Sequence, residues 1–400
     1  MDAEEKTTPR QVNPSQLIQL VLFVSIRIII NTAYRMIYPF LPAFAAGMGV
    51  SIQQASLALT GRSLIAMAGP AVAPVADRYG RKIGMLLGLG LFTIGVSLVA
   101  LRPSYPAFFA ALVLANFGNQ VFLPAMQAYL GDRLPYERRG GVLAVTEMSW
   151  SLSFIILVPL AGLLIARLGW ASPFLFLSLL SLLVLGLLAL ILPSDRSGAT
   201  ADQTRVGIRK GIARVFANPV ARAALLFSLV ITIANEIVNL VFGVWMNDAF
   251  QLDIAALGIA AIIVGAAELS GETAAAVLVD RVGKKRVIRV GLAVTSLASL
   301  ALPLLGESVL GALIGLFGFY VGFELALVSF IPLMTEVSPQ ARATLMAVNM
   351  ATLSLGRAAG ALSGSWLYTF GFWANAAAAL ALNLLAFFLL KRVRAGTGED

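Results

Sequence analysis

The sequence predicts an all-α membrane protein in which twelve membrane-spanning helices form two pseudo-symmetric bundles of six. Three observations lead to this prediction. Apolar residues make up 59% of the 400 positions and the mean hydropathy is +0.88, far outside the range of soluble domains. Apolar runs of about 20 residues, long enough to cross a hydrocarbon core of about 30 Å, recur along almost the whole chain. The second half repeats features of the first at an offset of 202 to 204 positions.

The apolar runs are continuous and rich in Leu, Ala and Gly, which favours helices over the short alternating strands of a membrane barrel. The first run is too long and carries too many polar residues for a cleaved signal peptide, so we expect it to remain as a span. The expected spans are 16–43, 53–76, 83–101, 105–131, 141–166, 172–193, 220–246, 254–277, 286–304, 308–334, 343–368 and 372–391.

Basic residues predict the topology. The two tails and the even-numbered turns hold 23 of the 29 Lys and Arg, whereas the opposite turns hold Arg102 and Arg167. This bias places both termini in the cytoplasm and makes the chain a multi-pass protein of the inner cell membrane. Anionic lipid headgroups account for the net charge of +9, so no nucleic-acid partner is needed. The chain has no Cys and no His, so any proton carrier inside it must be a carboxyl group.

The longest connection predicts the domain boundary, because it opens with a polar stretch that contains Gly and Ser. We expect an N-terminal six-helix bundle over 1–193, a cytoplasmic linker over 194–219 and a C-terminal six-helix bundle over 220–400. In the linker, Ile208, Ile212, Val215 and Phe216 lie on one helical face, opposite three arginines. This pattern predicts a short amphipathic helix at the membrane interface.

A short charged motif occurs once in each half. The sequence "VADRYGRKIG" covers 75–84 and "LVDRVGKKRV" covers 278–287, which places Asp77 and Asp280 203 positions apart. A second pair of stretches, 132–145 and 336–348, keeps an acid, a Pro, an Arg and a helix start in the same order. Six spans in each copy, in parallel orientation, are the plan of a twelve-helix transporter with its pathway between the halves.

In these motifs the chain resembles the major facilitator superfamily over essentially all of its length. The family's signature after span two is matched by Asp77, Arg78, Gly80, Arg81 and Lys82, and in the second copy by Asp280, Arg281, Gly283, Lys284 and Lys285. Alanines Ala73 and Ala276 stand where the signature begins with Gly. The glycines allow a tight reversal of the chain.

The resemblance implies a gating role for the motif. It implies that Asp77 pairs with Arg138 or Arg139 after span four, and that Asp280 pairs with Arg342 in the mirror arrangement. Such clamps close the cytoplasmic side in one state and release it in the other. The alternative is that the motifs only anchor the topology.

Ionisable residues inside the spans identify the candidate pathway, because each costs about 2.5–3.5 kcal/mol at the helix centre unless it is paired or hydrated. Arg27, Asn31, Tyr34 and Tyr38 share one face of span one. Glu268 and Glu272 share a face of span eight, and mutual repulsion makes one of them a plausible proton carrier. The whole expected pathway set is Arg27, Asn31, Tyr34, Arg35, Tyr38, Arg62, Asn116, Gln120, Glu236, Asn239, Glu268, Glu272, Tyr320, Glu324 and Arg357.

Two further features of this set affect its interpretation. Tyr320 and Glu324 are the repeat equivalents of Asn116 and Gln120, so we expect both pairs at one central location. Glu147, two turns into span five, is expected in a vestibule. The alternative for the set is a network of interior ion pairs that only holds the helices together.

The sequence has no phosphate-binding loop, no metal-ligand cluster and no nucleophile paired with a base, so we expect no enzyme, no cofactor and no bound metal. An ion gradient remains as the energy source, and membrane carboxylates without His favour protons. The resemblance to the drug-efflux branch predicts proton-coupled export of small amphipathic compounds. That branch carries GPxxGG in span five, of which Pro159 and Gly162 remain here, and span four has no arginine.

Two other functions stay open: uptake of a polar or anionic metabolite, and lipid translocation or sensing without transport. The expected partners are a small-molecule substrate, protons and membrane lipids, without nucleic acid, and we expect a monomer.

Overall fold

The computed structural model describes residues 14–67, 80–134, 136–193, 204–338 and 341–393. Over these ranges the backbone is helical and contains no strand. Eleven helical segments are long and apolar enough to cross a membrane, and the described part of the expected second span is Ile52–Ala66. The predicted all-α membrane fold is therefore confirmed.

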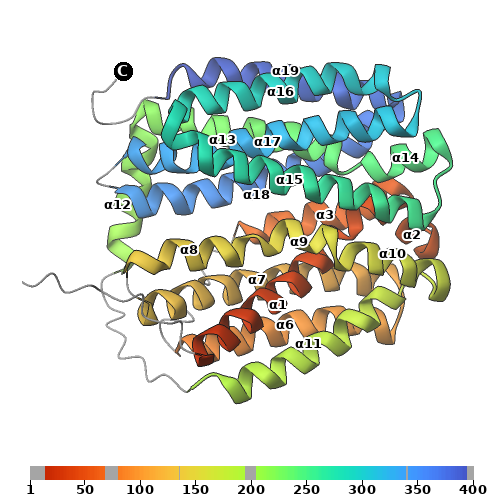
Figure 1. Cartoon of the computed structure of the whole chain (residues 1–400), viewed down its shortest axis with the longest axis horizontal. Coiled ribbons are helices and arrows are strands. Elements are labelled where there is room, and N and C mark those ends of the chain that lie inside the picture. Colours follow the sequence, from red (N-terminus) through yellow and green to blue (C-terminus); the bar gives the residue numbers. More distant parts are fainter. Residues whose placement is uncertain (1–13, 68–79, 135, 194–203, 339–340, 394–400) are drawn as a thin grey trace, which may run out of the picture.

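Helices of the first half occupy one side of the molecule (Figure 1). They are α1 (Pro14–Arg35), α2 (Ile37–Met48), α3 (Ile52–Ala66), α6 (Arg81–Leu101), α7 (Tyr105–Arg133), α8 (Tyr136–Glu147), α9 (Ser149–Ile155), α10 (Leu157–Leu168) and α11 (Ser172–Ile191). Helices of the second half form the other side. They are α13 (Pro219–Asn239), α14 (Phe242–Phe250), α15 (Ile254–Val282), α16 (Lys284–Leu305), α17 (Val309–Val337), α18 (Arg342–Leu367), the short η2 (Tyr368–Phe370) and α19 (Phe372–Leu390).

Two expected spans are each broken into two helices at equivalent points of the repeat. The first break lies at Met36, between α1 and α2, and the second at Leu240 and Val241, between α13 and α14. Prolines explain the first, because Pro39 and Pro42 remove amide donors and Phe40 leaves helical geometry (φ −104°, ψ 15°). The two broken regions pack together, since a Cβ at Gly243 would lie 2.4 Å from the Pro39 carbonyl oxygen. Irregular backbone at this depth is thus covered by protein rather than by lipid.

Close helix crossings also repeat between the halves. A Cβ at Gly88 on α6 would lie 2.6 Å from the Gly118 carbonyl oxygen on α7. In the second half, a Cβ at Gly291 on α16 would lie 2.7 Å from the Gly322 carbonyl oxygen on α17. Both crossings depend on small residues that let two helix backbones touch. The duplication seen in the charged motifs therefore extends to the packing of the helices.

The two halves meet through α2 and α14, α9 and α10 with α15, and α3 with α18. Gly162 on α10 approaches the Ile254 carbonyl oxygen, and Gly265 on α15 approaches the Ser151 carbonyl oxygen and Phe154. A ridge of Gly356, Gly360 and Gly364 packs α18 against α13 within the second half. The inter-half contacts bring the ends of the bundles together near α2, α10 and α14 (Figure 1).

A helix within the expected linker, α12 (Thr204–Ala217), lies at the opposite end and packs on α18 and α13. Its Val215 is fully buried, whereas Phe216 is 51% exposed. The predicted linker helix is present, and part of its apolar face packs on protein. The side chain of Ile208 lies outside the described residues.

Candidate functional site

A cavity of about 470 Å³ lies between the first half and α18 of the second half. Its walls come from α1, α3, α7, α8, α9 and α18. Apolar and aromatic side chains form much of the lining: Ile30, Tyr34, Leu112, Leu123, Trp150, Met350 and Leu353. The polar lining consists of Asn31, Ser63, Asn116, Asn119, Gln120, Gln127 and Ser354, with Arg27, Arg62, Glu147 and Arg357 as the charged members. Such a mixed surface suits a small molecule that has both apolar and polar parts.

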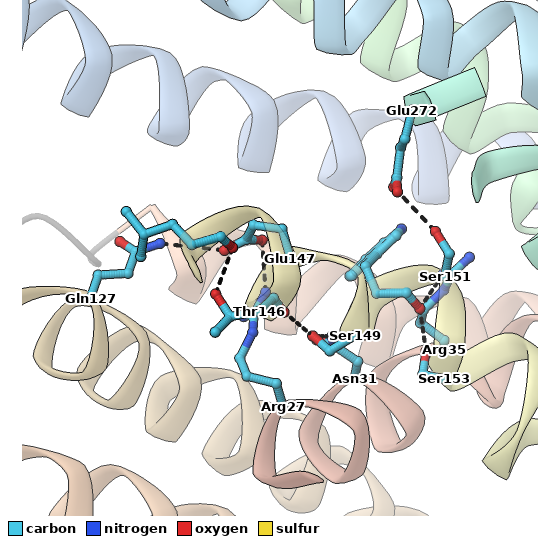
Figure 2. Close-up of polar contacts among 12 residues, drawn as sticks. Arg27, Asn31, Arg35, Gln127, Thr146, Glu147, Ser149, Ser151, Ser153 and Glu272 are labelled. Atoms are coloured by element: carbon cyan, nitrogen blue, oxygen red, sulfur yellow. Dashed lines mark hydrogen bonds and ion pairs between the residues drawn. The ribbon is translucent and has the colours of Figure 1, made fainter. Parts of the chain in front are cut away.

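An ion pair stands on the cavity wall between α1 and α8. Arg27 donates to Glu147 across 2.8 Å, and Gln127 donates to the other carboxylate oxygen across 3.4 Å. The Arg27 side chain is 4% exposed, whereas that of Glu147 is 52% exposed. One turn along α1, Asn31 donates to the Ser149 hydroxyl at 3.2 Å (Figure 2). Because Glu147 is half-exposed, water weakens this pair to about 1 kcal/mol or less.

Arg62 on α3 anchors the inner wall of the cavity. Its guanidinium lies over the Tyr34 ring, 3.5 Å from the centroid, and donates to the Tyr34 carbonyl at 2.9 Å. It also donates at 2.8 Å to the Tyr38 hydroxyl, which in turn donates at 2.9 Å to Glu236 on α13. Asn116 holds the Arg62 backbone by donating to its carbonyl at 2.6 Å. A hydrogen-bonded chain therefore runs from the cavity wall into the second half.

A second connection between the halves is a buried ion pair. One guanidinium nitrogen of Arg35 donates to both oxygens of Glu268 on α15, at 2.6 and 2.5 Å. The same guanidinium donates to the Trp150 carbonyl and lies 3.6 Å from the centroid of the Phe154 ring. Beside this pair, Ser151 on α9 donates to Glu272 on α15 at 3.1 Å. Figure 2 shows these two side chains, which come from the two halves, pointing toward each other.

Glu324 differs from the other acidic residues of the pathway set. It is 6% exposed and, within the described part of the chain, makes no hydrogen bond or ion pair. A Cβ at Gly271 would lie 2.8 Å from the Cβ of Glu324, which places this carboxyl beside the stretch of α15 that carries Glu268 and Glu272. Nearby, Tyr320 donates to Asn239 at 2.7 Å.

The structure divides the predicted pathway set in two. Seven members line the cavity: Arg27, Asn31, Tyr34, Arg62, Asn116, Gln120 and Arg357. The other eight are not among its lining residues: Arg35, Tyr38, Glu236, Asn239, Glu268, Glu272, Tyr320 and Glu324. The expectation that Tyr320 and Glu324 share one location with Asn116 and Gln120 is therefore wrong for this conformation. The physical reason is that, of the second half, α18 supplies the cavity wall, whereas the acidic residues of α13, α15 and α17 face other helices.

The structure also adds two residues to the cavity that are not in the expected pathway set. Trp150 lines the cavity and borders the Arg35 guanidinium at 4.4 Å from its ring centroid, and Glu147 lines the cavity as the partner of Arg27. The signal was the stretch "SWSLS" at 149–153, in which polar and apolar residues alternate inside an apolar span. Among the described residues, no group of three or more acidic side chains is arranged to hold a metal ion.

Comparison with known proteins assigns the fold to a family. The model of the Major Facilitator Superfamily matches residues 23–323 and 224–400. The chain belongs to the major facilitator superfamily. It is a multi-pass membrane transporter of that family, and its relatives include proteins named for multidrug resistance.

One relative is the uncharacterized MFS-type transporter YwfA of Bacillus subtilis, which is 34% identical over 140 residues, or 34% of each protein. The chain thus matches about a third of the length of that relative. Multidrug resistance protein 1 of Bacillus subtilis is 25% identical over 306 residues, covering 74% of this chain and 77% of the relative. Among solved structures, the peptide transporter POT in complex with sulfate has a TM-score of 0.77 at 14% identity, with 97% of each chain covered. At this identity the likeness concerns the fold alone.

The superfamily motif has the same local geometry in both halves. Gly80 and Gly283 adopt positive φ values of 101° and 91°, which confirms that these glycines make a reversal other residues rarely adopt. Arg81 pairs with Asp132 at 3.4 Å, and the equivalent Lys284 pairs with Glu336. Lys82 donates to the carbonyls of Ala189 and Leu192 at the end of α11. The basic residues of the motif therefore tie neighbouring helices of the same half together.

The expected clamp of the second half is not formed. Asp280 is exposed and has no ion pair among the described residues, and Arg342 donates instead to the Thr335 carbonyl at 2.9 Å. The pairing of Asp280 with Arg342 is thus wrong for this conformation, in which the motif holds the bundle through Lys284 and Glu336 while Arg281 is exposed. Asp77, Arg78 and the side chains of Arg138 and Arg139 lie outside the described residues, so the first clamp stays a prediction.

Proposed function

We propose that this chain is a proton-coupled exporter of small amphipathic organic compounds that works by alternating access. The observation that carries the proposal is the cavity of about 470 Å³ between the halves, with its mixed aromatic, aliphatic and polar lining. This volume lies in the range of about 300–1,000 Å³ found for small-molecule sites. The relatives named for multidrug resistance support an amphipathic substrate and the outward direction.

The proposal includes an orientation. The bias of basic residues supports both termini in the cytoplasm of a protein of the inner membrane, acting as a monomer. In that orientation the cavity lies toward the cytoplasm, because Gln127 and Ala347 line it on the segments nearest the basic connections. The halves, 1–193 and 220–400, would then rock about the linker 194–219. Loading from the cell interior is the first step that an exporter needs.

Opening to the outside requires the contacts between the halves to break. These contacts are the Arg35–Glu268 ion pair, the Ser151–Glu272 hydrogen bond and the Tyr38–Glu236 hydrogen bond. Glu268 has a cationic partner, whereas Glu272 has a hydroxyl partner and Glu324 has none among the described residues. A carboxylate without a cationic partner at this depth is costly, so proton binding by Glu272 and Glu324 supplies the coupling.

Transport by everted membrane vesicles tests the function. Vesicles energised by respiration should accumulate fluorescent amphipathic compounds, and a protonophore should abolish the accumulation. Glu324→Gln should lose this dependence on the proton gradient, whereas Glu307→Gln, which changes an exposed acid in an outer turn, should keep it. Accumulation by right-side-out vesicles alone would refute export, and accumulation that is indifferent to the gradient would refute proton coupling.

Uptake of an anionic metabolite is the second candidate. The excess of arginine on the cavity wall favours the anionic substrate of this candidate: among the described lining residues, Arg27, Arg62 and Arg357 outnumber the one acidic residue, Glu147. Growth on single organic acids, with and without the gene, tests this function. A growth advantage that depends on Arg357 would favour uptake over export.

A further inference from the structure

We infer that the transported compound is an amphipathic organic anion whose acidic group binds Arg357 and Arg62 and whose apolar body lies along Trp150. The inference rests on the proposed function in taking this cavity as the transport site. It goes further by specifying the charge of the substrate and the residues that bind it.

The charges on the cavity wall do not cancel. Arg27 and Glu147 pair at 2.8 Å and neutralise each other, which leaves Arg62 and Arg357. Glu236 interacts electrostatically with both of these arginines and Glu324 interacts with Arg357, but both carboxyls are buried and neither is among the lining residues. Glu324 is a proposed proton carrier and is neutral while it holds its proton, so Glu236 alone is counted against the two arginines and one positive charge remains. A molecule with one negative charge therefore neutralises the site.

Arg357 differs from the other two arginines of the cavity wall. Within the described part of the chain it makes no hydrogen bond and no ion pair, although it is half-buried at membrane depth. The ring centroid of Trp150 lies 6.0 Å from its guanidinium carbon. A guanidinium has five donors that match a carboxylate or phosphate in fork geometry, so an unpaired arginine facing a cavity is a site for such a group.

Arg62 lies on the same cavity but is fixed in place. Stacking on Tyr34 and hydrogen bonds to the Tyr34 carbonyl and the Tyr38 hydroxyl hold its guanidinium, while its Nε has no partner among the described residues. Fixing the guanidinium in advance removes part of the entropy cost of binding an anion. Arg62 thus supplies a rigid positive charge, and Arg357 supplies free donors.

The rest of the wall excludes a cation and suits an apolar body. Glu147, the one acidic residue among the described lining residues, is already paired with Arg27. Trp150, Met350 and Leu353 provide apolar surface on the side of the cavity that also carries Arg357. A compound with an aromatic or aliphatic body and one carboxylate, sulfonate or phosphate matches this arrangement.

Three dansyl compounds of similar size and different charge test the inference on the purified full chain. Dansylglycine is an anion, dansylamide is neutral and dansylcadaverine is a cation, and dansyl fluorescence increases in an apolar site. We expect dansylglycine to bind at least about tenfold more tightly than dansylamide, since one charge-assisted pair is worth about this much. Dansylcadaverine should bind most weakly.

Variants assign the preference to residues. Arg357→Gln should remove the preference for dansylglycine and leave the affinity for dansylamide unchanged, whereas Arg357→Lys should keep most of it. Arg102→Gln, which removes an exposed arginine far from the cavity wall, is the matched control and should change nothing. Thermal unfolding of each variant in detergent identifies any loss of fold. If Arg357→Gln does not fold, the order in which the three dansyl compounds bind to the unmodified chain still tests the charge of the substrate.

The outcomes separate this inference from the proposed function. The inference would be overturned if dansylcadaverine bound most tightly, if all three compounds bound equally, or if none of them bound. It would also be overturned if Arg357→Gln kept the preference for dansylglycine. If everted vesicles accumulate dansylcadaverine with the proton gradient, export is supported and the anion inference is refuted. If dansylglycine binds through Arg357 but is not transported with the gradient, the anion site is supported and export is refuted.

Discussion

Breaking the Arg35–Glu268 ion pair should open the protein toward the outside. Both side chains are almost fully buried, at 3% and 5% exposure, and they join α1 of one half to α15 of the other. Glu268→Gln leaves the Arg35 charge in place without its counter-charge. Loss of one partner from a buried pair costs about 3–5 kcal/mol. Arg35 keeps the Trp150 carbonyl and the Phe154 ring, so we take the lower value of about 3 kcal/mol.

This cost applies to the conformation in which the halves are closed at the ion pair. In a conformation in which the halves are separated at this point, Arg35 is exposed to water and this cost is absent. The equilibrium should therefore shift toward the open outer side by about 10²-fold, because each 1.4 kcal/mol is a factor of about ten. The effect should exceed that of any single substitution on the exposed surface.

Cysteine labelling can measure the shift, because the chain contains no cysteine of its own. Gly258→Cys introduces a thiol on α15 at the seam with α10, where a Cβ would lie 3.4 Å from the Pro159 Cα atom. A membrane-impermeant maleimide added from outside should label this thiol about 10²-fold faster in the Glu268→Gln background. Glu307→Gln is the matched control, as it removes an exposed carboxylate and should leave the rate unchanged. Equal labelling rates in both backgrounds would show that the ion pair does not hold the outer side closed.

Three further predictions concern individual residues. Glu324→Gln should flatten the pH dependence of transport while substrate binding persists, and a pH profile identical to that of the unmodified protein would remove Glu324 from the coupling. Glu236→Gln should tighten dansylglycine binding by about tenfold, because it removes the negative charge that reaches Arg62 through Tyr38, and weaker binding would contradict this. Gly360→Ala should lower the thermal stability by about 1–3 kcal/mol, because its Cβ would lie 2.5 Å from the Glu236 Cβ. Gly90→Ala, at a site with open space, is its control and should be neutral or stabilising.

The fold could be predicted from the sequence because lipid imposes strong rules on composition. Apolar runs predict the spans, and the match between Asp77 and Asp280 predicts the duplication. The repeat extends beyond the charged motifs, since the breaks at Met36 and Leu240 and the glycine crossings at Gly88 and Gly291 keep an offset of 203 or 204 positions. Local rules and repeats act over short distances or at a fixed offset, which is why one sequence suffices to find them.

The partners of the buried charges could not be predicted. Arg27 pairs with Glu147, 120 positions away, and Arg35 pairs with Glu268, 233 positions away. These pairings depend on how helices pack within the first half and between the two halves, and helical spacing along one segment does not contain that information. An acidic residue in a span is expected to be either hydrated or paired with a cationic residue, and Glu268 is paired with Arg35. Helical spacing places Tyr38 on the face shared by Arg27, Asn31 and Tyr34, but it does not line the cavity with them because the helix is broken at Met36.

The charge of the substrate affects which direction of transport the membrane potential can drive. Each elementary charge moved across the membrane is worth about 2.3 kcal/mol per 100 mV. An exchanger that moves one monoanion out and one proton in transfers two charges with an inside-negative field, about 4.6 kcal/mol per 100 mV. Uptake of the same anion with one proton is electrically neutral and gains nothing from the potential. A site that presents Arg62 and Arg357 to its ligand is therefore better powered as an exporter, which joins the anion inference to the proposed direction of transport.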